Sequence, residues 1–308
     1  SLLLVFPPLV IGVINKGKAL MAGCQGPPLS QAYYDIWKLL HKGAVFSTVT
    51  SPLFRIGPAA SLATVLLAGM MLPLLGPSAP LGFTGDVIAW AYLLALGRFL
   101  TITAALDTGS SFEGMGASRE ASLSALAEPA LFLALALICV PAQSMSFQQV
   151  LPGLSAASSW LAQPGALLAA LALFWVLLAE NARIPVDDPN THLELTMIHE
   201  VMVLDHSGPD LALIHYGSAM KLFVFGSLLI QIIWPQLLLA LWQRALWLCA
   251  GQILLAIVIG LVESMLARYR LQRLTQLLLG ASVLAAVGLT VLFYQGHPGT
   301  AAQKFCVW

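Results

Sequence analysis

One stretch of this chain, LLAENARIPVDDPNTHLELTMIHEVMVLDHSGPD (177–210), concentrates side chains that could transfer protons or bind a charged partner. Carboxylates and imidazoles exchange protons near neutral pH when their surroundings shift their pKa values. The stretch follows directly on an apolar run, where ionisable groups are rare. Its ionisable residues are Glu180, Arg183, Asp187, Asp188, Glu194, Glu200, Asp205, Asp210 and the histidines His192, His199 and His206.

A metal site is one alternative for these residues. His199-Glu200 resembles the start of an H-E-x-x-H zinc motif, but position 203 is Val203, so the second histidine is missing. The four cysteines lie far apart, without a C-x-x-C pair, which argues against an iron–sulfur cluster or a structural zinc in this chain. We therefore expect hydrogen-bonded or solvated histidines and no metal site.

A second group of acids lies inside apolar segments. Glu120, Ser124 and Glu128 are spaced i, i+4, i+8 and form one polar stripe along a helix. A charge at the membrane centre costs about 3 kcal/mol, so Glu128 is expected to face the bundle interior or a wet cavity and is a candidate proton carrier. The alternative is a neutral glutamate that only packs helices. Glu263 repeats the pattern in a later segment, where Arg270 is a simple pairing partner.

Two basic residues need partners. Arg98 lies within an apolar segment, and Asp107 and Glu128 are equally good candidates to pair with it. Arg183 follows Glu180 by three positions, which fits an ordinary ion pair at the membrane interface. With Glu128 and Glu263 nearby in the bundle, the same residues could equally line a chain of carboxylates.

The composition requires a membrane to position these residues. Of the 308 residues, 59% are hydrophobic and 9% charged, and the mean hydropathy is +0.86; soluble domains carry about 25% charged residues. The chain is predicted to be an all-α polytopic membrane protein with one domain, 1–308. About eight spans are expected near 1–20, 53–75, 86–106, 121–141, 160–180, 219–241, 246–267 and 274–295. The first span is expected to bend at Pro7–Pro8 and is short, so we expect further residues before Ser1.

Basic residues predict the orientation. The loops near 21–52, 107–120, 181–218 and 268–273, with the flanking span ends, carry eleven of the fourteen Lys and Arg residues: Lys16, Lys18, Lys38, Lys42, Arg55, Arg119, Arg183, Lys221, Arg268, Arg270 and Arg273. The positive-inside rule places these loops in the cytoplasm and both termini outside it. The net charge is zero, so nothing points to nucleic acid. The acids share the charged side, which topology does not require. The gathering of acids on this side indicates either a docking surface for a soluble partner or an ion pathway that enters from the cytoplasm.

The loops are expected to hold amphipathic helices. Ser30 could cap a helix in the segment GPPLSQAYYDIWKLLHKG (26–43). One face of this helix would be apolar, and Asp35 and Lys38 would lie on the opposite face. After Pro185 and Pro189, a capping box of Thr191 and Glu194 predicts a helix near 192–204, ended by Gly208-Pro209. LDTGSSFEGMGASREA (106–121) lacks a phosphate-loop pattern and is expected to form a glycine-rich turn.

These segments together resemble a known family. GPPLSQAYYDIWKLLHK, the RE…EP of the fourth span and AENARIPVDDPNTHLEL are similar to subunit 1 of respiratory complex I, whose third-loop pattern falls here on Glu180, Arg183, Pro185, Asp187 and Glu194. LDTGSSFEGMGASREA and the whole acidic stretch look more like the membrane subunit of energy-converting nickel–iron hydrogenases of the formate hydrogenlyase and hydrogenase-4 group. Asp188, Asn190 and His192 depart from the complex I pattern, which argues against quinone chemistry more than against docking.

The resemblance implies a non-catalytic subunit that anchors a redox arm in the bacterial inner membrane and couples it to proton translocation. The implied proton-pathway residues are Glu120, Glu128, Glu180, Glu194 and Glu263. The implied docking or loop-orienting residues are Asp35, Lys38, Arg98, Asp107, Arg119, Arg183, Asp187, His199 and Glu200.

The same resemblance implies the partners and cofactors. The partners are soluble hydrogenase-like large and small subunits, a ferredoxin-like iron–sulfur subunit, an antiporter-like membrane subunit and the lipid bilayer. The nickel–iron centre and iron–sulfur clusters belong to those partners, and lipid is the one ligand considered for this chain. The rival hypotheses are a quinone-site subunit of a complex I-type NADH dehydrogenase and a stand-alone transporter. The second is disfavoured because the sequence has no internal repeat.

Overall fold

The computed structural model describes residues 2–47, 49–76, 78–156, 164–187, 197–234, 240–266 and 271–296, and these residues form helices and no strand. In chain order the helices are α1 (Leu2–Val5), α2 (Pro7–Met21), α3 (Gln31–Leu40), α4 (Pro52–Met71), α5 (Asp86–Asp107), α6 (Ser111–Ala142), α7 (Phe147–Ala156), α8 (Pro164–Glu180), the 3₁₀ helix η2 (Glu200–Val203), α9 (Pro209–Ile233), α10 (Leu241–Met265) and α11 (Leu271–Gly296).

Six of these helices are long and apolar enough to cross a membrane, namely α4, α5, α6, α9, α10 and the Arg273–Tyr294 part of α11. A seventh apolar helix, α8, is shorter. The prediction of an all-α polytopic protein is therefore confirmed. The first predicted span is interrupted where α1 ends at Val5 and α2 begins at Pro7, as the two prolines led us to expect.

Several predicted loops are wrong in extent. The glycine-rich turn expected over 106–121 is reduced to a short connection, because α5 ends at Asp107, Gly109 has a φ of +69°, and α6 begins at Ser111. Helix α9 begins at Pro209, ten residues before the predicted span, because Gly208-Pro209 starts a helix rather than only ending one. The helix expected near 192–204 is only η2 in its described part, and Thr191 and Glu194 lie outside the described residues. Helix α7 was not predicted.

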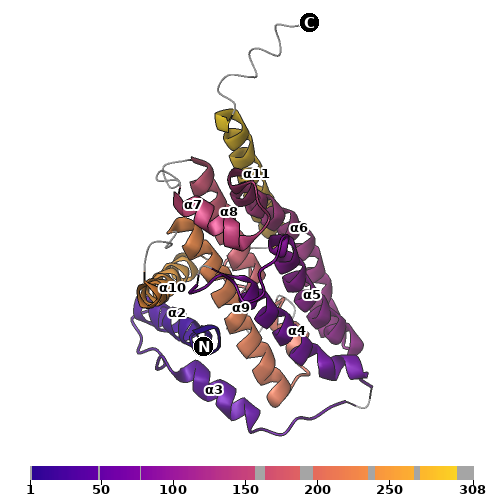
Figure 1. Ribbon diagram of the computed structural model, residues 1–308. Coiled ribbons are helices and arrows are strands. Elements are labelled where there is room, and N and C mark those ends of the chain that lie inside the picture. Colours follow the sequence, from indigo (N-terminus) through magenta and orange to yellow (C-terminus); the bar gives the residue numbers. More distant parts are fainter. Residues whose placement is uncertain are drawn as a thin grey trace, which may run out of the picture.

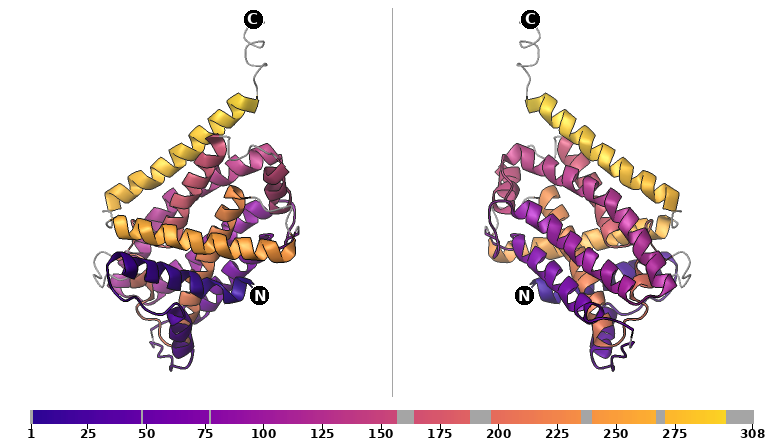
Figure 2. Two further views of the ribbon diagram at one scale, coloured as in Figure 1. Left: turned by 90° about the vertical axis from the view of Figure 1, so that its left-hand side faces the viewer. Right: turned by 90° about the vertical axis from the view of Figure 1, so that its right-hand side faces the viewer.

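Helix α9 is the centre of the bundle. It packs against α2, α3, α4, α8 and α10, and it is the most buried of the long helices. Figure 1 shows α9 between α4 and α5 on one side and α2 and α10 on the other. In Figure 2, α2 and α10 lie side by side, and α11 runs along the edge of the bundle against α6 and α8. Polar residues on α9 are therefore placed where several helices can supply partners.

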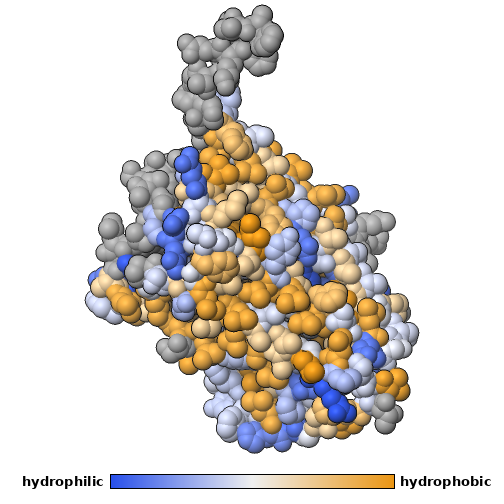
Figure 3. All heavy atoms as spheres, turned by 45° about the vertical axis from the view of Figure 1, so that its right-hand side comes forward, coloured by the Kyte–Doolittle hydropathy of each residue, from blue (hydrophilic) through white to orange (hydrophobic). Residues whose placement is uncertain are grey.

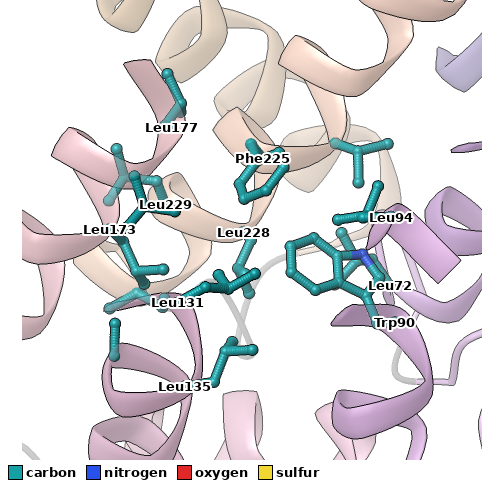
Figure 4. Packing of buried hydrophobic residues seen from close by; sticks show 14 of the residues in the cluster. Leu72, Trp90, Leu94, Leu131, Leu135, Leu173, Leu177, Phe225, Leu228 and Leu229 are labelled. Carbon is teal, nitrogen blue, oxygen red and sulfur yellow. The ribbon is translucent and has the colours of Figure 1, made fainter. Parts of the chain in front are cut away.

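Apolar side chains fill the centre and cover much of the outside. Trp90 of α5 is fully buried and meets the ring of Phe225 of α9 edge-on, with centroids 5.1 Å apart (Figure 4). Leu131 and Leu173 extend this core toward α6 and α8. The face in Figure 3 is mainly hydrophobic, and hydrophilic residues gather in patches at its margins. This surface suits contact with lipid or other membrane helices, since lipid tails are as apolar as leucine.

The first loop, between α2 and α4, and the third loop, between α8 and α9, are held together by hydrogen bonds of the Ser207 side chain and by a close backbone contact. The Val45 N–H donates to the Ser207 hydroxyl over 3.0 Å. Gly208 has a φ of +58°, and a Cβ there would lie 2.8 Å from the carbonyl oxygen of Gly43. Only glycine satisfies both constraints, so this position fixes the close approach of the two loops.

Candidate functional site

The strongest ionic cluster is built around Glu180, the last residue of α8. Its carboxylate lies 2.9 Å from the Arg98 guanidinium of α5 and 2.8 Å from the Lys221 ammonium of α9, and only 1% of the Glu180 side chain is exposed. Because α8 is apolar and packs into the bundle, its last residue, Glu180, is buried as well. A buried carboxylate stays charged only if cations lie next to it. We call Arg98, Glu180 and Lys221 the Glu180 cluster. Arg98 was expected to pair with Asp107 or Glu128, and its closest partner is neither.

A second cluster surrounds Glu263 of α10. Its buried carboxylate lies 2.9 Å from Lys18 of α2 and 3.6 Å from Arg183. Arg183 therefore pairs with Glu263 in place of Glu180, and Arg270, the partner considered from sequence, lies outside the described residues. Because Glu180 and Arg183 are three residues apart, this short segment connects the two clusters.

The predicted stripe on α6 lies beside the Glu180 cluster. Glu120 lines a cavity together with Arg98 and Glu180. The carboxylate of Glu128 is 3.8 Å from Arg98, but 42% of its side chain is exposed. Glu128 thus lies at the rim of the cluster and is partly exposed, whereas we expected it to face the bundle interior or a wet cavity.

Three cavities lie between the loops and the Glu180 cluster. The outer cavity has a volume of about 480 Å³ and lies between α2, α3 and α9. The middle cavity, of about 210 Å³, is lined by residues of the third loop. The inner cavity, of about 70 Å³, reaches Arg98, Glu180 and Lys221. Adjacent cavities share walls. Asn15, His215 and Ser218 line both the outer and the middle cavity, and Asn181, His199 and Ser218 line both the middle and the inner cavity. Each volume exceeds the roughly 30 Å³ that one water occupies in the liquid.

Asp187 holds the third loop closed. One of its carboxylate oxygens accepts the backbone N–H groups of Ile198 and His199, both at 3.0 Å, and Asp187 is almost fully buried. Arg119 of α6 donates to the carbonyl of Met197 over 3.0 Å. His199 and Glu200 then face the middle cavity. Asp187 and Arg119 therefore fix residues 197–199, of which His199 lines the middle cavity.

The remaining predicted residues fall into two places. Asp35 and Lys38 of α3 line the outer cavity, and Asp35 accepts a hydrogen bond from Gln31 at 2.9 Å. Asp107 lies elsewhere, where it accepts the backbone N–H of Ser51 at 2.7 Å before α4 begins. Ser30 takes the N-cap position of α3 but makes no side-chain capping bond. Glu194 lies outside the described residues.

Three important residues were not singled out from sequence. Lys221 and Lys18 were counted only as topology signals, yet each pairs with a buried glutamate. The sequence signal for Lys221 was a lysine within an apolar run. It was missed because the predicted span began at 219, which placed Lys221 at the end of a span, whereas α9 begins at Pro209. Glu113, fully buried on α6, accepts the backbone N–H of Asp205 at 2.9 Å. The only feature of the sequence that pointed to Glu113 was its position as an acid in the first turn of a helix.

His206 gives the loop contact a pH dependence. Its ring stacks on Phe54 with centroids 4.0 Å apart, and only 5% of the residue is exposed. Burial lowers the pKa of His206 to about 4, against the opposing effect of Asp205. As pH falls below the unfolded value near 6.5, only the unfolded state gains a proton, so stability falls until the folded pKa is reached.

We therefore expect acidification to destabilise this contact. Between pH 6.5 and pH 5 the loss is about 1.6 kcal/mol, measurable as a lower melting temperature in detergent. A His206→Phe variant keeps an aromatic ring on Phe54 without a titrating group, and its loss over the same pH range should be smaller by that amount. Equal losses in the two proteins would contradict this assignment.

No group of three or more His, Cys, Asp or Glu side chains is placed to hold a metal ion within the part of the chain that the structure describes. The ionisable residues are instead paired with cations, bonded to backbone N–H groups or placed along the cavities. This arrangement of ionisable groups supports proton transfer and charge coupling.

Comparison with known proteins decides the family. The family model described as NADH dehydrogenase matches residues 1–294. The chain belongs to this family, that of complex I subunit 1. Within it, the chain is 36% identical to hydrogenase-4 component C of Escherichia coli (strain K12) over 216 residues, 70% of this chain and 67% of that protein. It is 30% identical to formate hydrogenlyase subunit 4 of the same organism over 299 residues, 92% of this chain and 94% of that protein.

A solved structure shows the same fold. The match is a chain of the membrane-bound sulfane sulfur reductase, an archaeal respiratory membrane complex, with a TM-score of 0.82, 23% identity and coverage of 94% of this chain and 95% of that chain. The predicted relationship to complex I subunit 1 and to the membrane subunits of hydrogenase-type complexes is confirmed. This member of the NADH dehydrogenase family is a multi-pass membrane protein.

Proposed function

We propose that the chain is the anchoring and proton-pathway subunit of a formate hydrogenlyase- or hydrogenase-4-type complex. The observation that carries this proposal is the series of three cavities between the loop surface and the Glu180 cluster, in which neighbouring cavities share lining residues. Its two E. coli relatives are a hydrogenase-4 component and a formate hydrogenlyase subunit. Redox chemistry belongs to a soluble arm, and this chain couples that chemistry to protons in the membrane.

The loops provide the surface for the arm. Asp187 and Arg119 fix the third loop, and α3 presents the exposed rings of Tyr34 and Trp37 beside it. Exposed aromatic side chains are common in protein interfaces. We place this surface in the cytoplasm, as the positive-inside rule requires, with both termini on the other side of a bacterial inner membrane.

The clusters provide the coupling. A change of charge in a docked arm alters the potential at the nearest buried ions, and this biases which carboxylates hold protons. Glu120, Glu180 and the exposed rim residue Glu128 are the carriers that we propose, with Glu263 coupled to them through Arg183. The exposed side of Glu128 suits a further membrane subunit of the antiporter type. Glu194 stays a predicted carrier.

The nickel–iron centre and iron–sulfur clusters are assigned to partner subunits: hydrogenase-like large and small subunits and a ferredoxin-like subunit. Purification in mild detergent, with subunit identification and metal analysis, tests this assignment. Nickel and iron that co-purify with a hydrogenase-like large subunit are the expected result. A metal-free chain that purifies alone in several mild detergents would contradict it and would favour a transporter.

A quinone-site subunit is the second candidate function. The outer cavity, at about 480 Å³, falls within the roughly 300–1,000 Å³ typical of small-molecule sites and is lined mainly by apolar groups of α2, α3 and α9. A purified assembly that contains flavin and quinone but no nickel would select this function over the hydrogenase type.

A further inference from the structure

We propose that His199 is the proton-relay residue between the middle and the inner cavity, so that protons pass through its imidazole ring on their way to the Glu180 cluster. This inference rests on the proposed function and deepens it. It assigns to the His199 side chain the transfer of a proton from the middle cavity to the inner cavity.

The cavities place His199 at this junction. Only His199, Asn181, Ile214 and Ser218 line both the middle and the inner cavity in the described part of the chain. Of these four, the imidazole is the only side chain that can take up and release a proton near neutral pH, because an amide, an alkyl group and a hydroxyl do not titrate there. The middle cavity also carries Asp187 and Glu200, and the inner one carries Glu120 and Glu180.

Contacts of the loop backbone fix the position of His199. Asp187 accepts the N–H of His199 itself, and the preceding carbonyl of Ile198 packs closely on α6, where a Cβ at Gly116 would lie 3.0 Å away. The His199 residue lines both the middle and the inner cavity, so water in either cavity can reach it. A relay requires a side chain on a fixed backbone that borders both cavities, and His199 has both properties.

The surrounding charges allow the ring to be protonated transiently. Burial lowers the pKa of His199, Glu120 of α6 raises it, Lys221 of α9 lowers it, and Asp187 of the loop raises it. His215 of α9 lies near enough for the two imidazoles to influence each other. The ring is therefore neutral at rest, and nearby carboxylates stabilise the imidazolium when a proton arrives.

The transfer step balances without any further reactant. One ring nitrogen accepts a proton from water or Glu200 on the side of the middle cavity. The other nitrogen releases its own proton to water or Glu120 on the side of the inner cavity. The ring then exchanges its tautomer and is ready for the next proton, and no electron or covalent bond changes hands.

The experiment uses inverted membrane vesicles that contain the whole complex, with reduced methyl viologen as electron donor. Proton translocation is followed with a pH-sensitive dye beside hydrogen production. We expect His199→Gln, which preserves polarity but cannot relay a proton, to slow translocation about tenfold or more. In His199→Gly, added imidazole should restore translocation, a rescue that a purely structural role would not give. His206→Phe, in the same loop but at neither cavity, keeps the ring on Phe54; it is the matched control and should match the wild type.

The outcomes separate this inference from the proposed function. If Glu180→Gln abolishes translocation while His199→Gln keeps the wild-type rate, the relay is overturned and the proposed function stands. If imidazole fails to rescue an assembled His199→Gly complex, the relay is also overturned. If wild-type vesicles translocate no protons at all, or if both variants match the wild type, the proposed pathway itself fails.

Discussion

Replacing Glu180 by glutamine is expected to abolish proton coupling and to destabilise the bundle. The change leaves Arg98 and Lys221 buried without their shared counter-charge, and breaking a buried ion pair from one side costs about 3–5 kcal/mol. Proton translocation should fall about 100-fold, because glutamine cannot hold or release a proton. Thermal unfolding in detergent measures the first effect, and dye-based translocation in vesicles measures the second.

A second variant separates these two effects. Glu180→Gln combined with Lys221→Met removes one of the two stranded cations, so stability should recover in part while translocation stays lost. Glu113→Gln is the control, since Glu113 is a buried acid that lines none of the three cavities and its amide oxygen can still accept the Asp205 N–H. If the double variant regained translocation together with stability, Glu180 would be a structural residue only.

Replacing Asp187 by alanine is expected to release the soluble arm. The change removes the acceptor for the Ile198 and His199 N–H groups, and each buried donor left without a partner costs about 1–3 kcal/mol. Opening the loop lets water satisfy these donors, so the loop should open while the helices remain folded. Co-purification of the arm in mild detergent should then fall sharply, with little change in the melting temperature of the bundle.

Asp205→Ala is the matched control for this variant. Asp205 is an acid in the same segment, but its side chain is exposed and its backbone N–H, which Glu113 binds, remains. The arm should stay attached in this protein. Retention of the arm by both variants would remove the third loop from the docking surface.

Local sequence patterns predicted the spans but not the way their charges pair. Apolar runs set the positions of α4, α5 and α10 within a few residues, since each run must cross the membrane. The starts of α6 and α9 were missed because Gly, Ser and charged residues there imitate a loop, while packing against the bundle keeps them helical. Propensity is a weak guide where tertiary contacts oppose it.

The sequence pointed to the buried acids of the clusters but not to their lysine partners or to the way the charges pair. Spacing alone identified Glu128, and Glu263 stood out as an acid in an apolar run. The pairing of Glu180 with Arg98 and Lys221 joins three helices that are distant in sequence, and no local pattern encodes it. The cavities share this property, because their walls come from separate helices. Local patterns therefore predict which residues are unusual, while only the fold shows what they touch.

The wide separation of the paired charges has a consequence for biogenesis. Lys18 and Arg98 leave the ribosome before the carboxylates that neutralise them, and Glu263 is synthesised only near the end of the chain. Each early cation must therefore wait at the membrane interface or in the insertion machinery, because an unpaired charge within lipid is costly. The bundle can close only after α8 and α10 have inserted. A truncated or stalled chain would expose lone buried cations, a feature by which membrane quality-control proteases could distinguish unfinished subunits from complete ones.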